Sequence, residues 1–232
     1  MFVSSSDVGP VRLAQHRAVI DAAKRARVRL IVYTSILNAD RSGMMLVGEH
    51  KATEDIIRES GIPYLILRNG WYFENYANTI KQAAEHGAIT GSAGDGRVSA
   101  ASRVDFAEAA AAVLAGEGHE NKAYELGGDR AFTMGELAAE VARQAGREVI
   151  YRDVPAEAYA ESLVGFGVPE PFARVLADSD LGIKRGELYT DSRELRELSG
   201  RPTTTLEEAV AAALGDATAA RGAAVAGADE LK

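Results

Sequence analysis

The chain has 232 residues, of which 47% are hydrophobic and 26% charged, and its formal net charge is -8. This length allows one sizeable core, or a core with a smaller lobe, and the composition is that of an ordinary globular protein. Lys and Arg are scattered, so the chain lacks the electrostatic footprint of a nucleic-acid-binding protein. It contains no cysteine, which excludes disulfides, thiolate metal sites and cysteine nucleophiles.

The N-terminus, MFVSSSDVGP, has neither the basic region nor the apolar stretch of a signal peptide. The most apolar helical tract, residues 107–116, is too short to span a membrane and contains Glu108. We therefore expect a cytoplasmic protein that does not enter a membrane. His16, His86 and His119 lie apart with no second ligand at metal spacing, so no metal site is expected.

Strands and helices are predicted to alternate through the first part of the chain. The expected order is the end of a strand at residues 2–3, a helix over 11–26, a strand over 28–33, a loop over 38–46, a helix over 47–60 and a strand over 64–67. This alternation is typical of a parallel sheet with right-handed crossover connections.

The middle of the chain continues in short elements: a helix over 74–85, a loop over 88–96, a helix over 107–115, and strands over 124–126 and 149–151. Asp105 is the expected N-cap of the Ala-rich helix. Thr133 and Glu136 form a capping box that predicts a further helix start, with Phe132 and Leu137 as its hydrophobic staple. The glycines of the 88–96 loop do not lie between a strand and a helix, so they indicate a plain turn rather than a dinucleotide fingerprint.

From residue 155 the pattern is mostly helical, over 156–164, 170–176, 192–198 and 206–214. Such a lobe after an α/β core is expected to cover a site. We thus predict an α/β fold with a Rossmann-like core over 1–148, a smaller helical substrate lobe over 149–214 and a frayed, flexible tail over 215–232.

The stretch 61–75, GIPYLILRNGWYFEN, contains the candidate binding edge. Its apolar run at 64–67 is typical of a strand buried on both faces, and it leads straight into Arg68, Asn69 and the residues that follow. Thr34 and Ser35 end the preceding strand in the same way. Because ligands of open α/β sheets bind beyond the carboxyl ends of the strands, these polar residues are expected to converge on one crevice.

Seven segments carry a resemblance to a known family: SSSDVG (4–9), QHRAVIDAAK (15–24), YTSILNAD (33–40), residues 49–76, AGDG (93–96), YELGGD (124–129) and GRPTTTLEE (200–208). They resemble the NmrA-like, atypical short-chain dehydrogenase/reductase proteins, most of all the bacterial flavin-free NAD(P)H:quinone oxidoreductases. The resemblance implies a Rossmann-like sheet with a smaller substrate-covering lobe, NADPH or NADH as cofactor and a small quinone as substrate.

The family begins with a strand, a Gly-rich turn and a helix that hold the cofactor pyrophosphate, and the resemblance starts after them. About two βαβ units of roughly 30 residues each are thus expected to be missing. We expect a weakened cofactor site, because part of its anion-binding helix start is lost. We also expect the first strand to be an exposed edge unless the tail or another chain, such as a second copy in a homodimer, covers it.

The wider superfamily uses a helical Tyr-x-x-x-Lys motif, often with Glu four residues later, and a Ser at a strand end. The resemblance places Leu46 at the Tyr position, His50 at the Lys position, Glu54 at the Glu position and Ser35 at the strand end. His50 and Ser35 are therefore the predicted catalytic residues. A missing helical Tyr suits a quinone, because hydride transfer yields a hydroquinone anion that can take its proton from water.

The predicted cofactor-binding residues extend this set along the three strand ends: Ser4, Ser5, Ser6, Thr34, Ser35, His50, Arg68, Asn69, Gly70, Trp71 and Tyr72. Each has a purely structural alternative. The serines at 4–6 can cap a helix, the strand-end hydroxyls can make local hydrogen bonds, His50 can be a solvated helix residue, and the 69–72 loop can be a packed corner with Trp71 in the core. Lys51 is expected to be a surface charge, and Arg103 is expected to lie outside the site.

The predicted function is hydride transfer from NAD(P)H to a quinone-type acceptor held between the 69–72 loop and the helical lobe. The first alternative is a non-catalytic NmrA-like sensor that binds a dinucleotide and signals through a partner. The second is a truncated product with neither activity. The sequence leaves open the choice between NADH and NADPH, the quinone and the oligomeric state.

Overall fold

The computed structural model describes residues 1–3 and 10–215. Its elements, in chain order, are β1 (Phe2–Val3), α1 (Pro10–Arg25), β2 (Ile31–Ile36), α2 (Met45–Glu59), β3 (Tyr64–Asn69), the 3₁₀ helix η1 (Phe73–Tyr76), α3 (Ala77–His86), β4 (Ala88–Gly91), α4 (Arg103–Ala115), β5 (Lys122–Leu126), α5 (Met134–Ala145), β6 (Ile150–Asp153), α6 (Ala156–Gly165), α7 (Glu170–Lys184) and α8 (Glu194–Ser199). Residues 206–215 are also helical.

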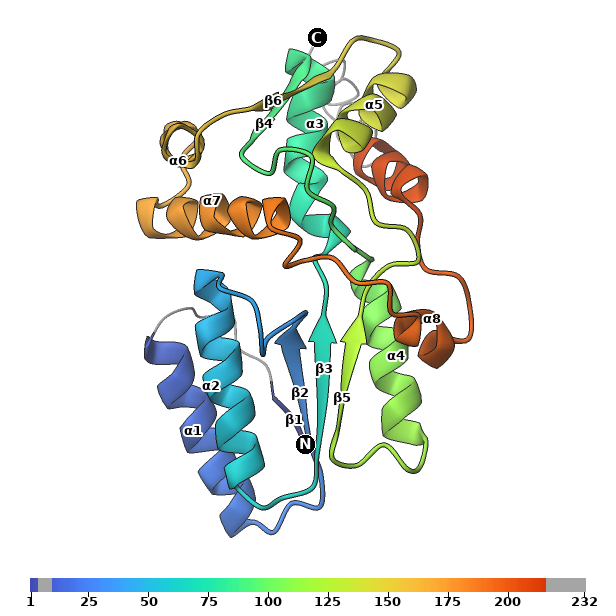
Figure 1. Ribbon diagram of the computed structural model, residues 1–232. Helices are drawn as coiled ribbons and strands as arrows, with labels where there is room; N and C mark the ends of the chain where they lie inside the picture. Colours follow the sequence, from blue (N-terminus) through green and yellow to red (C-terminus); the bar gives the residue numbers. More distant parts are fainter. Residues whose placement is uncertain (4–9, 216–232) are drawn as a thin grey trace, which may run out of the picture.

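The larger sheet has the order β1-β2-β3-β5, and all its pairings are parallel, which confirms the predicted α/β sheet. Helices α1 and α2 cover one face, and α4 with α8 covers the other (Figure 1). The alternation of side chains along β2 explains both layers. Ile31 and Tyr33 pack with α1 and α2, whereas Val32 between them packs with α4. The strand is therefore buried on both sides, as parallel strands are.

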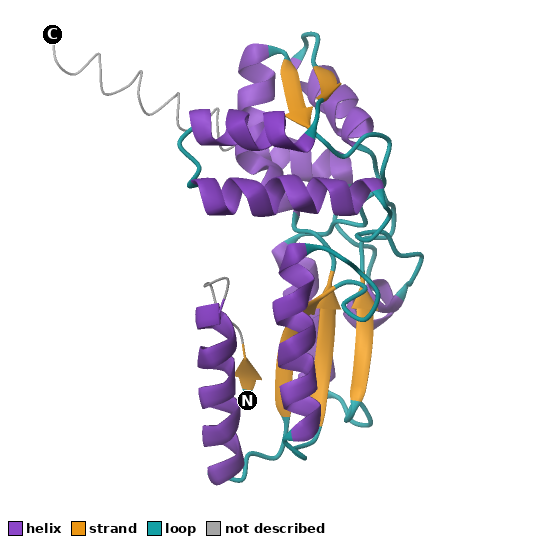
Figure 2. Ribbon diagram, turned by 60° about the vertical axis from the view of Figure 1, so that its left-hand side comes forward, coloured by secondary structure: helices purple, strands orange, loops and turns teal. Residues whose placement is uncertain are grey.

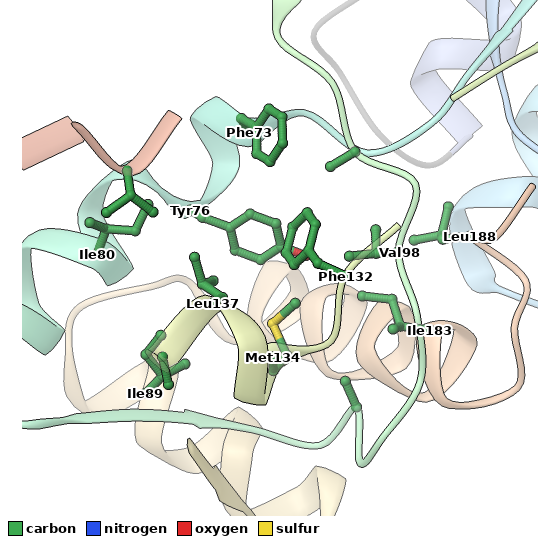
Figure 3. Packing of buried hydrophobic residues seen from close by; sticks show 14 of the residues in the cluster. Phe73, Tyr76, Ile80, Ile89, Val98, Phe132, Met134, Leu137, Ile183 and Leu188 are labelled. Carbon is green, nitrogen blue, oxygen red and sulfur yellow. The ribbon is translucent and has the colours of Figure 1, made fainter. Parts of the chain in front are cut away.

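A second, two-stranded parallel sheet is formed by β4 and β6. It packs with α3, α5 and the 206–215 helix around a separate apolar cluster (Figure 3). Within it Phe73 and Phe132 stack with ring centroids 5.6 Å apart, and Tyr76 meets Phe132 edge-on at 6.1 Å. The predicted division into domains at residue 148 stays a prediction. The apolar cluster contains residues from both sides of that point.

Several boundaries differ from the predictions. Residues 88–91 form β4 and not a loop, because Ile89 and Thr90 pair with Tyr151 and Arg152 of β6. The surrounding glycines had concealed this short strand, whose partner lies some 60 residues later. The strand predicted over 28–33 is β2, which begins at Ile31, and α7 continues past residue 176 to Lys184.

The starts of α4 and α5 are fixed by side-chain caps. The Thr133–Glu136 capping box is confirmed, with the Thr133 N–H donating to Glu136 Oε2 at 2.8 Å. Asp105 was predicted to be the N-cap of α4, but it is the third residue of that helix. Ser102 is the cap: its Oγ accepts the Asp105 N–H, and the Asp105 carboxylate accepts the Ser102 N–H. The predicted flexible tail lies outside the described residues, except for residue 215.

Helix α7 crosses above the carboxyl ends of the strands of the larger sheet (Figures 1 and 2). The helix and the turn that follows it are tied to that sheet through the loop after β2 and the start of α2. The Met45 N–H donates to Asp178 Oδ2 at 2.6 Å, and Asn38 Nδ2 donates to the Glu187 carbonyl at 2.8 Å. A space is thereby defined between the strand ends below and α7 above.

Candidate active site

A cavity of about 510 Å³ lies between the carboxyl ends of β2 and β3 and the underside of α7. This volume is within the usual range of small-molecule sites, roughly 300–1,000 Å³. The elements around the larger sheet and helix α7 both contribute to its wall, which consists of Arg12, His16, Tyr33, Thr34, Ser35, Ile36, Leu46, His50, Asn69, Gly70, Trp71, Tyr72, Asn75, Arg103, Phe172, Val175 and Leu176.

Most of the predicted site residues share this one wall. Thr34 and Ser35 come from the end of β2, His50 comes from α2, and the 69–72 loop follows β3. The predicted convergence of these strand ends is thus present for the residues that the structure describes. Ser4, Ser5 and Ser6 lie outside them. The functional roles of all these residues stay predictions.

Arg68 is the exception among the predicted residues in the described segments, because it does not line the cavity. Its guanidinium donates to both carboxylate oxygens of the fully buried Glu54, at 3.0 and 2.9 Å, and to Glu125 Oε1 at 2.7 Å. Burial alone would raise the pKa of Glu54, but hydrogen bonds from Arg68 and Ser35 hold it below the ordinary value. Arg68 and Glu54 therefore join β3 to α2 beneath the cavity.

Ser35 takes part in the same network. Its Oγ donates to Glu54 Oε1 at 2.6 Å, and the residue is buried. Since the hydroxyl proton points toward this carboxylate, it is directed away from the cavity in this arrangement. Thr34, the neighbouring strand-end residue, is only partly buried and also lines the cavity.

The loop after β3 is held by its backbone. The Gly70 N–H donates to the Leu126 carbonyl at 2.7 Å, and a Cβ on Gly70 would lie 2.5 Å from the Ser99 carbonyl oxygen. Asn69 Nδ2 donates to Tyr72 Oη at 3.2 Å, while Asn69 Oδ1 is buried without a hydrogen-bond partner among the described residues. An unpaired buried acceptor on a cavity wall is suited to a donor group of a ligand.

The sequence prediction missed five polar residues of the wall: Arg12, His16, Tyr33, Asn75 and Arg103. The sequence suggested no role for His16 beyond its distance from the other histidines. In the structure α1 places it beside Tyr33, with ring centroids 5.4 Å apart. Arg103 was expected to lie outside the site, but it lines the cavity. Its guanidinium lies over the Tyr72 ring, 5.4 Å from the centroid. Arg12 and His16 continue the buried stripe of α1, so polar residues on an otherwise apolar stripe were the available signal.

Behind the roof of the cavity, α7 carries a half-buried carboxyl, Asp180, which faces Tyr76, Tyr151, Tyr159 and Asp153. Its Oδ2 accepts the Ser92 N–H at 2.8 Å. Burial raises the pKa of Asp180 from an ordinary 3.8 to about 6, and the neighbouring Asp153 charge acts in the same direction.

Asp180→Asn should therefore change the pH dependence of stability. A carboxyl whose pKa is raised by folding contributes stability below its unfolded pKa and loses it as pH rises through about 6. We expect the variant to be more stable than the parent by about 2–3 kcal/mol at pH 8, with the difference vanishing toward pH 4. Urea unfolding across this range measures it, and a pH-independent difference would contradict this assignment.

The described helices include none with the length and apolarity needed to cross a bilayer.

The sheet order, the crevice at the carboxyl strand ends and the lobe above it define a Rossmann-type protein. The NmrA-like family model matches residues 2–208, and the chain belongs to the NmrA-like family.

Among individual relatives, quinone oxidoreductase 2 of Escherichia coli strain K12 is 49% identical over 210 residues, which is 90% of this chain and 73% of that protein. The crystal structure of the Escherichia coli NADPH-dependent quinone oxidoreductase complexed with NADPH superposes with a TM-score of 0.87, at 50% identity, over 90% of this chain and 73% of that one. A triphenylmethane reductase from Citrobacter sp., complexed with NADP(H), gives a TM-score of 0.86 at 37% identity, over 92% of this chain and 75% of that one.

Proposed function

We propose that this protein is an NADPH-dependent oxidoreductase that transfers hydride to a quinone-type acceptor. The proposal is supported by its membership of the NmrA-like family and by its similarity to an NADPH-dependent quinone oxidoreductase over 90% of the chain. It is supported independently by a cavity of suitable size at the carboxyl edge of the sheet. A cytoplasmic location and a homodimer remain parts of this proposal.

The observation that carries the proposal is the chemistry of the cavity wall. Asn69 offers a buried oxygen that has no hydrogen-bond partner in the described part of the chain, which fits an amide or hydroxyl donor such as those of a nicotinamide riboside. Trp71 and Tyr72 supply flat faces for planar rings, and Arg12 and Arg103 supply positive charge. These residues fit the nicotinamide end of the cofactor with a quinone beside it.

When bound, the nicotinamide supplies the hydride, so the protein's own contribution is positioning and exclusion of water. The roof of the cavity is apolar, because α7 contributes Phe172, Val175 and Leu176. The floor is polar and rigid, since Ser35 is anchored to Glu54 and Asn69 to Tyr72. A planar acceptor can then lie between this roof and floor.

The direct test is NADPH oxidation at 340 nm with and without a small benzoquinone. We expect little oxidation without the acceptor and steady turnover with it. The alternative function is a redox sensor, and a regulator of this fold, NmrA, is known in complex with NADP, although at 15% identity the similarity is one of fold alone. Saturable cofactor binding without quinone-dependent turnover would favour that alternative and contradict the proposal.

Asn69→Ala should raise the KM for NADPH or quinone by about 10-fold, because one hydrogen bond to the ligand is lost. The fold should remain intact, since among the described residues the Asn69 side chain makes a single hydrogen bond, from Nδ2 to Tyr72 Oη at 3.2 Å, and its Oδ1 has no partner there. Steady-state kinetics measures the effect. Lys51→Ala is the matched control: Lys51 lies beside His50 but is paired with Asp55 on the helix surface, so its kinetics should not change. Unchanged kinetics of Asn69→Ala would remove this residue from the site.

A further inference from the structure

The charge of the cavity wall is opposite to that of the whole chain. The net charge of the protein is -8, yet the wall formed by the described residues contains two arginines and no Asp or Glu. Arg12 is the buried one of the two, with 8% of its surface exposed, while Arg103 is exposed. Positive charge in a cleft with low-dielectric walls favours negative charge on whatever occupies it.

A chain of hydrogen bonds beneath Arg12 has a defined direction. Thr53 Oγ1 donates to the Glu49 carbonyl at 2.9 Å, so its two lone pairs are left to accept. One of them accepts from His16 Nδ1 at 3.0 Å, which therefore carries a proton. The hydroxyl proton of Thr53 is committed to the Glu49 carbonyl as a result.

The contact with Arg12 fixes the tautomer of His50. Its Nε2 lies 3.3 Å from Arg12 Nη1, and because a guanidinium can only donate, Nε2 accepts. The proton of the neutral ring is then on Nδ1, which donates to Tyr33 Oη at 2.7 Å. His50 therefore presents a lone pair to Arg12 and has no proton to deliver on that side.

The protonation states agree with this geometry. Burial, followed by the charges of Arg12 and His16 on α1, lowers the pKa of His50 to about 3, although Glu54 on α2 acts in the opposite direction. Burial raises the pKa of Tyr33, and burial with Arg12 lowers that of His16. All three side chains are thus neutral around pH 7, and the positive charge at this end of the cavity belongs to Arg12.

We propose that Arg12 is a catalytic residue that donates an N–H to the acceptor oxygen on which negative charge develops, and that His50 and Tyr33 position it. The inference rests on the proposed function. Hydride transfer moves two electrons and one proton from the cofactor to the quinone, which becomes a hydroquinone monoanion while the cofactor is oxidised. Arg12 stabilises this anion without giving up its own proton, and water supplies the proton that completes the hydroquinone.

Other groups on the wall are less suited to this task. Ser35 directs its proton to Glu54, and Arg103 lies over the Tyr72 ring at an exposed position. Glu49 Oε2 lies 3.7 Å from Arg12 Nε, and Glu49 is not among the described residues that line the cavity. This ion pair helps to hold the guanidinium in place, and the described part of the wall contains no carboxylate.

The kinetic test compares Arg12→Gln with Arg17→Gln, an exposed arginine of the same helix. We expect kcat with a benzoquinone to fall about 100-fold in Arg12→Gln, as on removal of an oxyanion donor, with Arg12→Lys in between and Arg17→Gln unchanged. The kcat of the parent should not decline as pH rises from about 6 to about 8, because no protein acid is involved. A kcat that falls with pH, or one that Arg12→Gln leaves unchanged, would overturn the proposal.

A second test needs neither cofactor nor turnover. 4-Nitrophenol resembles the hydroquinone anion when ionised, and its ionised form is visible at 400 nm. Binding to the parent or to Arg17→Gln should lower the apparent pKa of 4-nitrophenol. Both proteins should bind the phenolate at least about 10-fold more tightly than Arg12→Gln does. Equal phenolate affinity in the parent and Arg12→Gln would refute the assignment of Arg12. If the parent prefers the phenolate and loses this preference in Arg12→Gln, but does not turn over quinones, the proposed function alone would be refuted.

Discussion

Replacement of Glu54 by Ala is expected to lower the free energy of unfolding by about 3–5 kcal/mol, because removing one partner of a buried ion pair leaves an uncompensated charge. Glu54 is fully buried and accepts hydrogen bonds from Arg68, Ser35 and, at 2.9 Å, Arg58. Its lowered pKa means that its contribution is present above the unfolded value near 4.5 and is lost as pH falls below it. Urea unfolding at pH 7 measures the change.

The matched control is Asp55→Ala on the same helix. Asp55 forms its ion pairs with Lys51 and Arg58 at the surface, so its loss should cost less than about 1 kcal/mol. If Glu54→Ala were no more destabilising than Asp55→Ala, the buried network would not hold α2 against β3, and the rigid floor that we assign to the cavity would have no support.

Gly70→Ala is expected to destabilise the protein by about 2–3 kcal/mol and to abolish ligand binding, because the strand end cannot accept another carbon atom. The added Cβ would lie 2.5 Å from the Ser99 carbonyl oxygen and 3.1 Å from that of Leu126. Both neighbours are backbone atoms, so relief requires the 69–72 loop to move, and this loop forms the wall of the cavity. Thermal unfolding and cofactor titration measure the two effects.

Gly48→Ala provides the control. Gly48 lies within α2, and apart from the neighbouring backbone of the helix itself no atom of the described residues lies within 4 Å of the position of its added Cβ. A Gly-to-Ala change in a helix should stabilise the protein by about 0.5–1 kcal/mol. A Gly70→Ala variant that is as stable as the parent would show that the loop tolerates displacement, in contrast to the packing described above.

The parallel sheet was predictable because its strands are strong local signals. The run at 64–67 is almost wholly apolar and becomes the central strand β3, and the Thr133–Glu136 capping box marks the start of α5. β4 was missed because its four residues form a strand only through pairing with β6, which local sequence does not reveal. The start of α4 was misplaced by three residues because both Ser102 and Asp105 are good caps, and only tertiary structure shows which role each takes.

The candidate site was predictable where it follows the strand ends. Asn69 and Trp71 come directly after β3, and the rule for open α/β sheets places them at the crevice. Arg12 and Arg103 could not be located in this way, because they enter the wall from helix starts whose approach to the crevice depends on packing. The roof was expected only as a helical lobe, and the contribution of Phe172 depends on how α7 crosses the strands.

The central claim, that the cofactor's nicotinamide occupies the cavity beneath α7, can be tested through Trp71, the only tryptophan of the chain and a residue of the cavity wall. Titration with NADP⁺ should quench its fluorescence in a saturable manner, and Asn69→Ala should shift the half-saturating concentration upward by about 10-fold. Emission that NADP⁺ leaves unchanged, or quenching that is the same in the Asn69→Ala variant, would contradict the placement of the site.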